Sequence, residues 1–323
     1  MAFSKPTASN MTQVWALASA LLWLQAAWAD NPTESKEADQ TLPAVQLVML
    51  GTGTPNADPD RSGPGVAVIV DGRSYLVDAG PGIVRRAAAA ARNGQPALEP
   101  SRLNTDFLTH LHSDHTVGLP DLILTPWVLE RDVPLRLFGP HGTAAMAQHL
   151  EEAYTQDIQL RLNGLEPANP EGYKVDVHEL TGPGPVLDED GLRVDAIAVQ
   201  HGSWPEAYGY RFRAHGKTIV ISGDTRPVPA IEQAAKGADI LVHEVYSDAG
   251  FKRRDEVWQR YHACFHTSAS ELAALASRAK PKLLVLYHQL YWGTSDPDLV
   301  KEIRDAGYNG KVVSARDLDV FTP

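Results

Sequence analysis

The sequence predicts an α/β fold built on mixed sheets. Short apolar runs of strand length alternate with helical segments along the chain, which is the pattern of sheets covered by helices. Two pairs of these runs are joined by tight turn signals, Asp71-Gly72 in one pair and Gly216 in the other, and these signals predict antiparallel hairpins. No fixed repeat and no long linker interrupts the alternation, so we expect one domain over residues 45–323.

The first residues have the composition of an export signal. Lys5 is the only charge among residues 1–29, residues 14–27 are apolar, and Ala27-Trp28-Ala29 has the small-x-small pattern that signal peptidase recognises. The apolar run is shorter than the ~20 residues that a transmembrane helix needs, which disfavours an uncleaved anchor. We therefore expect a signal peptide over residues 1–29, a flexible arm over residues 30–44, a secreted or periplasmic protein, and no membrane span after leader removal.

Charge and cysteine content narrow the possible partners. The chain carries 29 Lys+Arg against 40 Asp+Glu, a formal net charge of −11, and loss of Lys5 with the leader would make it −12. Because an acidic surface repels a phosphate backbone, we expect no nucleic-acid partner.

Cys264 is the only cysteine, so no intrachain disulfide can form. We expect Cys264 to be a small buried hydrophobic residue rather than a metal ligand.

Predicted strands and helices alternate in the N-terminal half. Apolar or β-branched runs predict strands at residues 45–50, 65–70, 74–77, 104–108 and 135–138. Helices are predicted at residues 83–92, 121–130 and 143–154, with Pro120 in the first turn of the second and Thr143 capping the third. Residues 51–55 are glycine-rich but lack the lysine and the following helix of a phosphate-binding loop, so we expect a tight turn near the mouth of the active site. Residues 156–171 are expected to form a loop.

The C-terminal half repeats the alternation. Strands are predicted at residues 174–180, 192–199, 207–212, 218–222, 240–244, 283–288 and 311–314. Between the first two of these, residues 181–185 predict a turn or a loop that faces the substrate. Thr267-Ser268 is the expected cap of a helix that ends near Ala279, and a last helix is predicted at residues 296–304.

A dense group of potential metal ligands follows the strand at residues 104–108. His110, His112, Asp114 and His115 offer imidazole nitrogens and a carboxylate, which are ligand atoms of zinc. Side chains two apart in an extended segment share a face, so His110 and His112 can hold one ion, while Asp114 and His115 on the following turn can reach a second. The alternative is a solvated histidine-rich loop, which this density and the position after a strand disfavour.

Three more candidates, His201, Asp224 and His288, also follow apolar strands. A structural role explains each of them alone at least as well, but their common placement favours a shared site. Seven ligands suit two ions that are bridged by one carboxylate, as in two-metal hydrolytic sites. The sequence therefore predicts two zinc ions, Zn2+, bound by His110, His112, Asp114, His115, His201, Asp224 and His288.

These motifs resemble the metallo-β-lactamase superfamily, whose motif is His-x-His-x-Asp-His. Within it, Leu50-Gly51-Thr52-Gly53-Thr54-Pro55 and Ser222-Gly223-Asp224-Thr225 are similar to the ribonuclease Z and arylsulfatase-like branch. The likeness covers about residues 45–291. It implies an αββα four-layer sandwich of two mixed β-sheets flanked by helices.

The resemblance also implies a role for each candidate. One zinc ion would be bound by His110, His112 and His201 and the other by Asp114, His115 and His288, with Asp224 bridging the two. Asp78, in Leu76-Val77-Asp78-Ala79-Gly80, matches an aspartate that braces the ligands and does not bind metal.

Two further motifs imply catalytic residues. His243-Glu244-Val245-Tyr246 resembles the branch's His-Glu-Ala-Thr element, and His266-Thr267-Ser268 resembles its His-Ser/Thr element. The resemblance implies that Glu244 and His266 together hand a proton to the leaving group, beside Asp114, which is both ligand and catalytic residue. The alternative is that Glu244 only ends a strand and that His266 is a surface residue before a helix.

One departure from ribonuclease Z shapes the functional expectation. Residues 138–199 contain no Lys/Arg-rich arm that would clamp tRNA. With the acidic charge, this leads us to expect an exported dinuclear zinc hydrolase that attacks a small-molecule ester, an aryl sulfate or phosphoester, with no nucleic-acid partner. A homodimer is compatible with the sequence.

Several alternatives to this function stay open. They are a phosphodiesterase or ribonuclease Z-like nuclease, a lactonase or β-lactamase, and a non-catalytic zinc-binding protein. Aromatic residues either line the site, which would suit an aryl substrate, or belong to the core. These residues are Trp127, Trp204, Tyr208, Tyr291 and Trp292.

Overall fold

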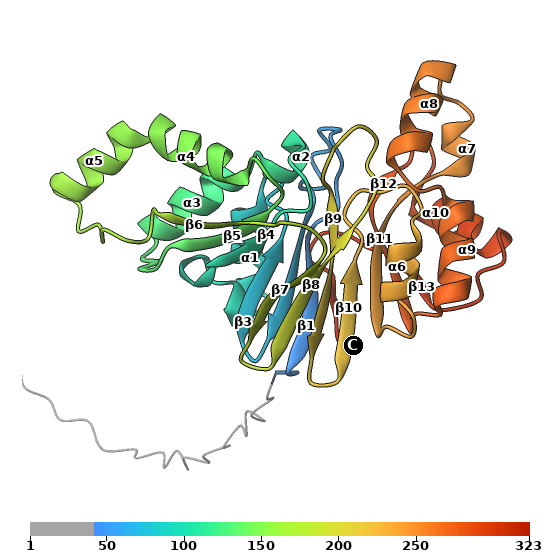
Figure 1. Cartoon of the computed structure of the whole chain (residues 1–323), viewed down its shortest axis with the longest axis horizontal. Coiled ribbons are helices and arrows are strands. Elements are labelled where there is room, and N and C mark those ends of the chain that lie inside the picture. Colours follow the sequence, from blue (N-terminus) through green and yellow to red (C-terminus); the bar gives the residue numbers. More distant parts are fainter. Residues whose placement is uncertain (1–41) are drawn as a thin grey trace, which may run out of the picture. The chain divides into compact units, whose positions relative to one another are not determined.

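The computed structural model describes residues 42–323 (Figure 1). The predicted signal peptide, residues 1–29, and residues 30–41 of the predicted arm lie outside the described residues. Leu42, Pro43 and Ala44 are exposed and lead directly into the first strand. No helix within residues 42–323 is long and apolar enough to cross a membrane.

Two mixed sheets of seven strands each form the centre of the domain. The first has the order β14-β1-β2-β3-β4-β5-β6 and the second the order β13-β12-β11-β10-β9-β8-β7. In each sheet an antiparallel part, β1 to β3 or β7 to β10, continues into a parallel part. The strands are β1 (Val45–Gly51), β2 (Gly65–Val70), β3 (Arg73–Val77), β4 (Thr105–Phe107), β5 (Leu135–Gly139), β6 (Val175–Glu179), β7 (Gly184–Glu189), β8 (Leu192–Ala198), β9 (Tyr208–Ala214), β10 (Lys217–Ile221), β11 (Ile240–Tyr246), β12 (Leu283–Leu290), β13 (Val312–Ser314) and β14 (Val320–Phe321).

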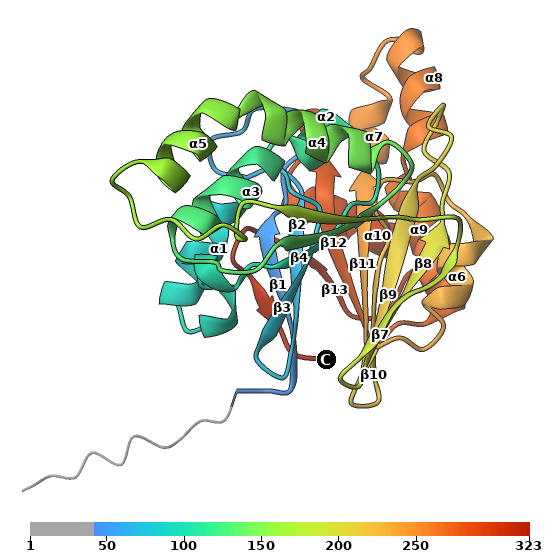
Figure 2. The same ribbon diagram turned by 60° about the vertical axis from the view of Figure 1, so that its left-hand side comes forward.

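Helices cover the outer face of each sheet (Figures 1 and 2). The first sheet packs against α1 (Ile83–Arg92), α3 (Leu119–Val128) and α4 (Thr143–Ala153). The second sheet packs against α6 (Pro229–Ala234), α9 (Ala269–Ala279) and α10 (Asp296–Asp305). The remaining helices are α2 (Ser113–Thr116), α5 (Thr155–Asn163), α7 (Asp248–Phe251), α8 (Glu256–Phe265) and the 3-10 turns Pro96–Leu98 and Pro100–Arg102. The order helix, sheet, sheet, helix confirms the expected four-layer sandwich.

Aromatic packing between the sheets fixes the start of the histidine-rich loop. Phe107, the last residue of β4, stacks on Phe138 at 4.8 Å between ring centroids and meets the edge of Phe212 at 5.6 Å. The Tyr210 hydroxyl donates a hydrogen bond to the carbonyl of Leu108 at 2.7 Å. Because these contacts come from both sheets, they hold the carboxyl end of β4 against the strand ends of the second sheet.

Two predicted connections are regular elements instead. Residues 156–171 were expected to form a loop, but Thr155–Asn163 is the helix α5. This helix buries only Ile158, so its sequence lacks the apolar periodicity that predicts a helix. Local ion pairs such as Arg161 with Asp157 at 3.0 Å stabilise the helix. The expected turn at residues 181–185 leads into the edge strand β7, Gly184–Glu189, whose side chains are only half-buried or exposed.

Two local expectations are also wrong, and one helix was missed. Thr143 is the first residue of α4, and the cap position is Gly142 with φ 102°. Cys264 is exposed, because it lies on the solvent side of α8 rather than in the core. That helix itself was not predicted, and it follows the turn α7 in a segment that the sequence analysis left without an element.

Candidate metal centre

The histidine-rich residues lie where β4 gives way to α2. His110 is fully buried just beyond the strand, and His112 is the residue before the helix, with the extended backbone of an N-cap. Asp114 and His115 occupy the first turn of α2. The chain therefore presents its ligand atoms from an extended segment and from a helical turn, as the spacing predicted.

Three histidines form a first set of facing ring nitrogens. His112 Nδ1 lies 2.9 Å from His110 Nε2 and 3.0 Å from His201 Nε2. His201 comes from the loop after β8, and its Nδ1 donates to the carbonyl oxygen of Phe265 at 2.8 Å. This bond places the proton of a neutral His201 ring on Nδ1. The lone pair of Nε2 is then free and points towards the other two histidines.

A second set consists of Asp114, His115 and His288. Asp114 Oδ2 lies 3.3 Å from His288 Nε2 and 3.5 Å from His115 Nε2. Both imidazoles are fully buried. The ligand atoms of the three residues lie within 4.8 Å of one another, a spacing that one ion can fill.

Asp224 stands between the two sets. Its Oδ2 lies 3.4 Å from His115 Nε2, 3.4 Å from His288 Nε2 and 3.9 Å from His201 Nε2. Burial opposes ionisation, but His288 and His115 outweigh it and hold the pKa of the Asp224 carboxyl well below its usual range. The residue therefore offers a carboxylate to both groups of ligands. The structure thus brings all seven predicted ligands together.

A β-bulge aims His288 into the centre. Opposite β11, Glu244 pairs with Tyr287 and Val245 pairs with Gln289, so His288 is the extra residue of β12. Its φ of 47° is left-handed, which is costly for a residue other than glycine and is typical of functional sites. The sequence analysis placed His288 at the end of the strand, whereas β12 continues to Leu290.

The ligand histidines fall into two groups. Burial opposes protonation of His115 and His288, but Asp224 and its neighbouring carboxylates outweigh it and raise both pKa values, so these two rings attract protons when no cation is bound. Burial lowers the pKa of His201 to about 3 and that of His110 well below its usual range, so both rings are neutral at pH 7. His115 Nε2 and Asp224 Oδ1 are buried and have no hydrogen-bond partner among residues 42–323. Unpaired buried atoms cost about 1–3 kcal/mol each, and a bound cation would satisfy them. Neutral imidazoles with carboxylates are typical zinc ligands.

Asp78 supports the ligands from behind. Its Oδ2 accepts a hydrogen bond from His115 Nδ1 at 2.8 Å, and its Oδ1 accepts one from the backbone N–H of Thr109 at 2.8 Å. The first bond holds the proton of His115 on Nδ1 and so directs Nε2 towards Asp224. Asp78 belongs to none of the candidate ligand groups within the described residues.

Glu244 and His266 lie beside the metal ligands. His266 Nδ1 is 3.4 Å from Glu244 Oε1 and 3.9 Å from Asp224 Oδ2. The backbone N–H groups of Thr225 and Thr267 donate to Glu244 Oε1 at 3.2 and 3.0 Å. Burial raises the pKa of Glu244 well above its usual range and lowers the pKa of His266 to about 4. His266 is buried, so it lacks the surface position that the alternative interpretation required, and Glu244 lies within β11, which continues to Tyr246.

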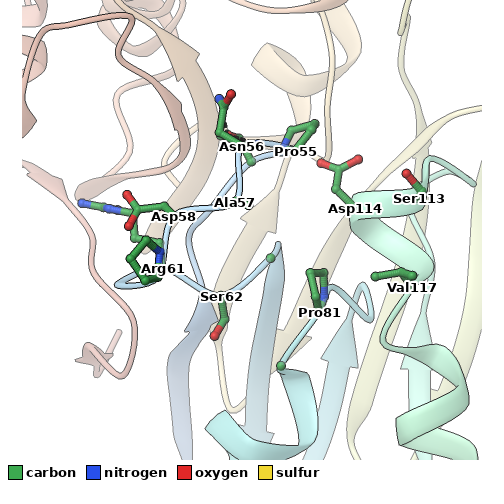
Figure 3. A pocket seen from close by; sticks show the side chains of 14 residues that line it. Pro55, Asn56, Ala57, Asp58, Arg61, Ser62, Pro81, Ser113, Asp114 and Val117 are labelled. Carbon is green, nitrogen blue, oxygen red and sulfur yellow. Dashed lines mark hydrogen bonds between the residues drawn. The ribbon is translucent and has the colours of Figure 1, made fainter.

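A cavity of ≈ 590 Å³ opens beside Asp114 (Figure 3). The β1–β2 loop forms one wall through residues such as Asn56 and Ser62, and α2 forms the other through Ser113, Asp114 and Val117. The loop with the glycine-rich turn thus lies at the mouth of the site, as the sequence predicted. A substrate in this cavity would reach the second set of ligands.

The sequence analysis missed the contacts that hold this loop. Arg61 donates to both oxygens of Asp296 at 3.1 and 3.0 Å, and Asp317 accepts from the backbone N–H groups of Thr52 and Ser62 at 2.9 and 2.7 Å. The partners are far apart in the chain, so spacing gives no signal for them.

Of the aromatic candidates, Trp204 lies at the ligands. Its indole nitrogen lies 2.7 Å from His112 Nε2. Tyr208 belongs to the core between the sheets, and Trp127 bonds the carbonyl of Asn169 on the outer layer. Tyr291 and Trp292 are half-buried beyond the end of β12.

Comparison with known proteins identifies the family. Residues 73–289 match the family described as Beta-lactamase superfamily domain. The chain is 33% identical over 285 residues to a protein named Ribonuclease Z from Mycobacterium bovis (strain BCG / Pasteur 1173P2), covering 85% of this chain and 96% of that protein. It is 36% identical over 253 residues to Ribonuclease Z of Mycobacterium avium (strain 104), covering 76% and 85%.

Solved structures share the fold. The metallo-beta-lactamase fold protein YhfI from Bacillus subtilis is 18% identical with a TM-score of 0.66, over 86% of this chain and 99% of that one. The short form of human tRNase Z is 22% identical with a TM-score of 0.64, over 86% and 98%. At these identities the likeness concerns the fold alone.

The relatives correct the expected partners. We expected a small-molecule ester substrate and no nucleic acid, but the relatives that match most of the chain are named as ribonucleases. The expectation failed because net charge averages over the whole surface, whereas RNA meets only the groups around the site. The fold, the clustered histidines and aspartates and these relatives lead to one conclusion: the chain belongs to the metallo-β-lactamase superfamily of metal-dependent hydrolases, in its ribonuclease Z-like branch.

Proposed function

We propose that the chain is a metal-dependent phosphodiesterase whose substrate is RNA. The observation that carries the proposal is the pair of ligand sets around Asp224, in a chain that matches proteins named Ribonuclease Z over 85% of its length. Two ions held side by side suit the in-line displacement at a phosphodiester, because they can neutralise charge on both the attacking and the leaving oxygen.

Each ligand set has a role in this proposal. Two zinc ions are assigned to the site, one to His110, His112 and His201 and the other to Asp114, His115 and His288, with Asp224 shared. Bound zinc would supply Lewis acidity and a hydroxide nucleophile near neutral pH. The protein's own contribution is to aim the imidazoles, through Asp78 on His115 and the Phe265 carbonyl on His201.

The proton for the leaving group is assigned to Glu244 and His266. Glu244 is fixed by two backbone N–H groups, and the imidazole of His266 is the titratable group next to it that faces the ligands. A general acid at this place would protonate the leaving ribose oxygen as the P–O bond breaks. Asp114 would orient the nucleophile, beside the cavity that would receive the substrate.

Cleavage of RNA is the direct test. Zinc-loaded protein without residues 1–29 should cleave a precursor tRNA with a 3′ extension. The kcat/KM for this RNA should exceed the kcat/KM for bis(4-nitrophenyl) phosphate, because contacts remote from the reacting bond add transition-state binding. The measurement is a gel assay for RNA beside an absorbance assay for the small diester. Hydrolysis of an aryl sulfate, a lactone or a β-lactam, with neither phosphodiester cleaved, would contradict the proposal.

We also propose that the protein is exported. The support is the apolar segment that ends in Ala27-Trp28-Ala29. Intact-mass measurement of the protein recovered from the extracytoplasmic fraction should give a chain that starts near Asp30. A chain that begins at Met1 and stays in the cytoplasmic fraction would refute export.

A further inference from the structure

Helix α8 projects from the domain beside the metal centre. In both views it rises beyond the strand ends at the same end of the molecule as α2, which carries Asp114 and His115 (Figures 1 and 2). Of its ten residues only His262 is buried. Its last residue, Phe265, accepts the hydrogen bond from the ligand His201. The helix therefore begins in solvent and ends at the metal ligands, a distance of about 15 Å at the usual helical rise.

One face of α8 is aromatic along its whole length. Trp258, Tyr261 and Phe265 follow the spacing i, i+3, i+7, which places them on one side of a helix. Tyr261 stacks on Phe265 at 4.2 Å between centroids, and Phe265 meets the His201 ring at 4.9 Å. Trp258 is 45% exposed near the outer end. An apolar face of a soluble helix normally packs on a core, and this one runs along the surface to the site.

Four cations without carboxylate partners lie on α8 or just before it. Lys252, Arg253 and Arg260 are exposed, and Arg254 lies over the rings of Trp258 and Trp292 at 5.3 and 5.7 Å. Within residues 42–323, none of the four makes an ion pair, although many other surface cations do, such as Lys174 with Glu171 and Arg278 with Glu232. The segment also carries three carboxylates, but Asp255 accepts from the backbone N–H of Trp258 and Asp248 accepts from Ser270, so neither neutralises these cations through an ion pair.

We propose that α7–α8, residues 248–265, is the binding surface for a single-stranded RNA segment next to the scissile bond. The proposal rests on the proposed function and adds the surface that recognises the substrate. Proteins bind single strands by combining cations that follow the backbone with aromatic rings on which bases stack. Both are present here, and they lead to the ligands at His201.

Charge favours RNA over a second copy of the chain as the occupant. The whole chain has a net charge of −11, so a second copy would bring an acidic surface of mixed charges, with no specific pattern to match four clustered cations. A polyanion with stacking bases matches both the cations and the aromatic face. Bases stack on any aromatic ring, so the surface should select single strands and should have little sequence preference.

The test measures RNA affinity for two variants of the zinc-loaded protein. The probe is a labelled single-stranded phosphorothioate RNA of about 12 nucleotides, within the usual range of such sites, that resists hydrolysis. Trp258→Leu should weaken binding about 5- to 150-fold, the equivalent of one lost stacked base. Lys252→Ala with Arg260→Ala should reduce the slope of log Kd against log salt by about 1.4, or about 0.7 for each phosphate contact.

A matched control removes two other exposed lysines. Lys236 precedes β11 and Lys311 precedes β13, at the end of the second sheet away from the ligands. Lys236→Ala with Lys311→Ala should keep the wild-type affinity and salt slope. Metal content and thermal unfolding of every variant show whether the centre and the fold are intact.

The outcomes separate this proposal from the proposed function. If the wild type cleaves RNA and both α8 variants bind it as the wild type does, the surface is wrong and the function stands. If the wild type binds RNA through α8 and cleaves no phosphodiester, the surface stands and the function is wrong. Unchanged RNA affinity with an altered sedimentation coefficient would instead assign α8 to contact between copies.

Discussion

Replacing Asp224 with alanine should empty the metal centre. Asp224 lies within 3.4 Å of His115 and His288 and within 3.9 Å of His201, so its loss removes a ligand from both sets at once. It also leaves the buried His115 and His288 without the carboxylate that offsets their burial. Elemental analysis should find about two zinc ions per wild-type chain and fewer than one in the variant. The rate on a phosphodiester should fall by about 10³-fold or more, because metal ions supply several kcal/mol of transition-state stabilisation.

Two further variants make this result specific. Asp224→Asn keeps the shape and removes the charge, so it should also lose metal, which separates electrostatics from packing. Asp195→Ala removes another buried carboxylate of the same sheet, one that pairs with Arg211 and Arg213 instead of the histidines. It should lower thermal stability and keep the zinc. Two tightly held ions in Asp224→Ala would show that Asp224 does not bridge the sets.

The sequence predicted the site well because strands bring distant residues together. His201 and Asp224 follow β8 and β10, which run in the same direction in the second sheet and so end at the same edge. His110 follows β4 of the first sheet, which packs against β9. Only the residue types and the strand periodicity were needed for this step. The His288 bulge could not be predicted, because the extra residue appears only when β12 is paired with β11.

Helices with few buried residues were missed for a physical reason. α5 buries Ile158 alone and α8 buries His262 alone, so neither packs a buried apolar stripe on a core. A signal for α8 was nevertheless present. Asp255 caps it by accepting from the N–H of Trp258 at 3.0 Å, and the aromatic residues at 258, 261 and 265 have helical spacing.

The expectation that the protein has no nucleic-acid partner rested on net charge and on residues 138–199, which contain no basic arm. The cations that make no ion pair within the described residues lie elsewhere, at residues 252–260. Formal charge sums every group equally, although a screened interaction extends only about 8–10 Å in physiological salt. The local arrangement around the site is therefore the better guide to a charged partner.

Replacing His266 should separate proton transfer from metal binding. His266 is assigned to the leaving group, so His266→Ala should keep about two zinc ions while its rate falls by about 10²–10⁴-fold, the usual contribution of a positioned general acid. Burial raises the pKa of Glu244 and lowers that of His266, so Glu244 is protonated and His266 is neutral at pH 7. A neutral imidazole needs a second proton to act as an acid. As Nε2 gives its proton to the leaving oxygen, Nδ1 would take the proton of Glu244, whose Oε1 lies 3.4 Å away.

The dependence on the leaving group tests this role. A basic alkoxide needs a proton to depart, whereas a nitrophenolate leaves without one, so the loss in His266→Ala should grow with the pKa of the leaving group. The measurement is a plot of log kcat/KM against that pKa for a series of aryl and alkyl phosphodiesters. His215→Ala is the matched control, because His215 pairs with Asp71 at 2.8 Å in the hairpin turns away from the ligands. Parallel lines for wild type and His266→Ala would mean that His266 and Glu244 only brace the loop beside the centre.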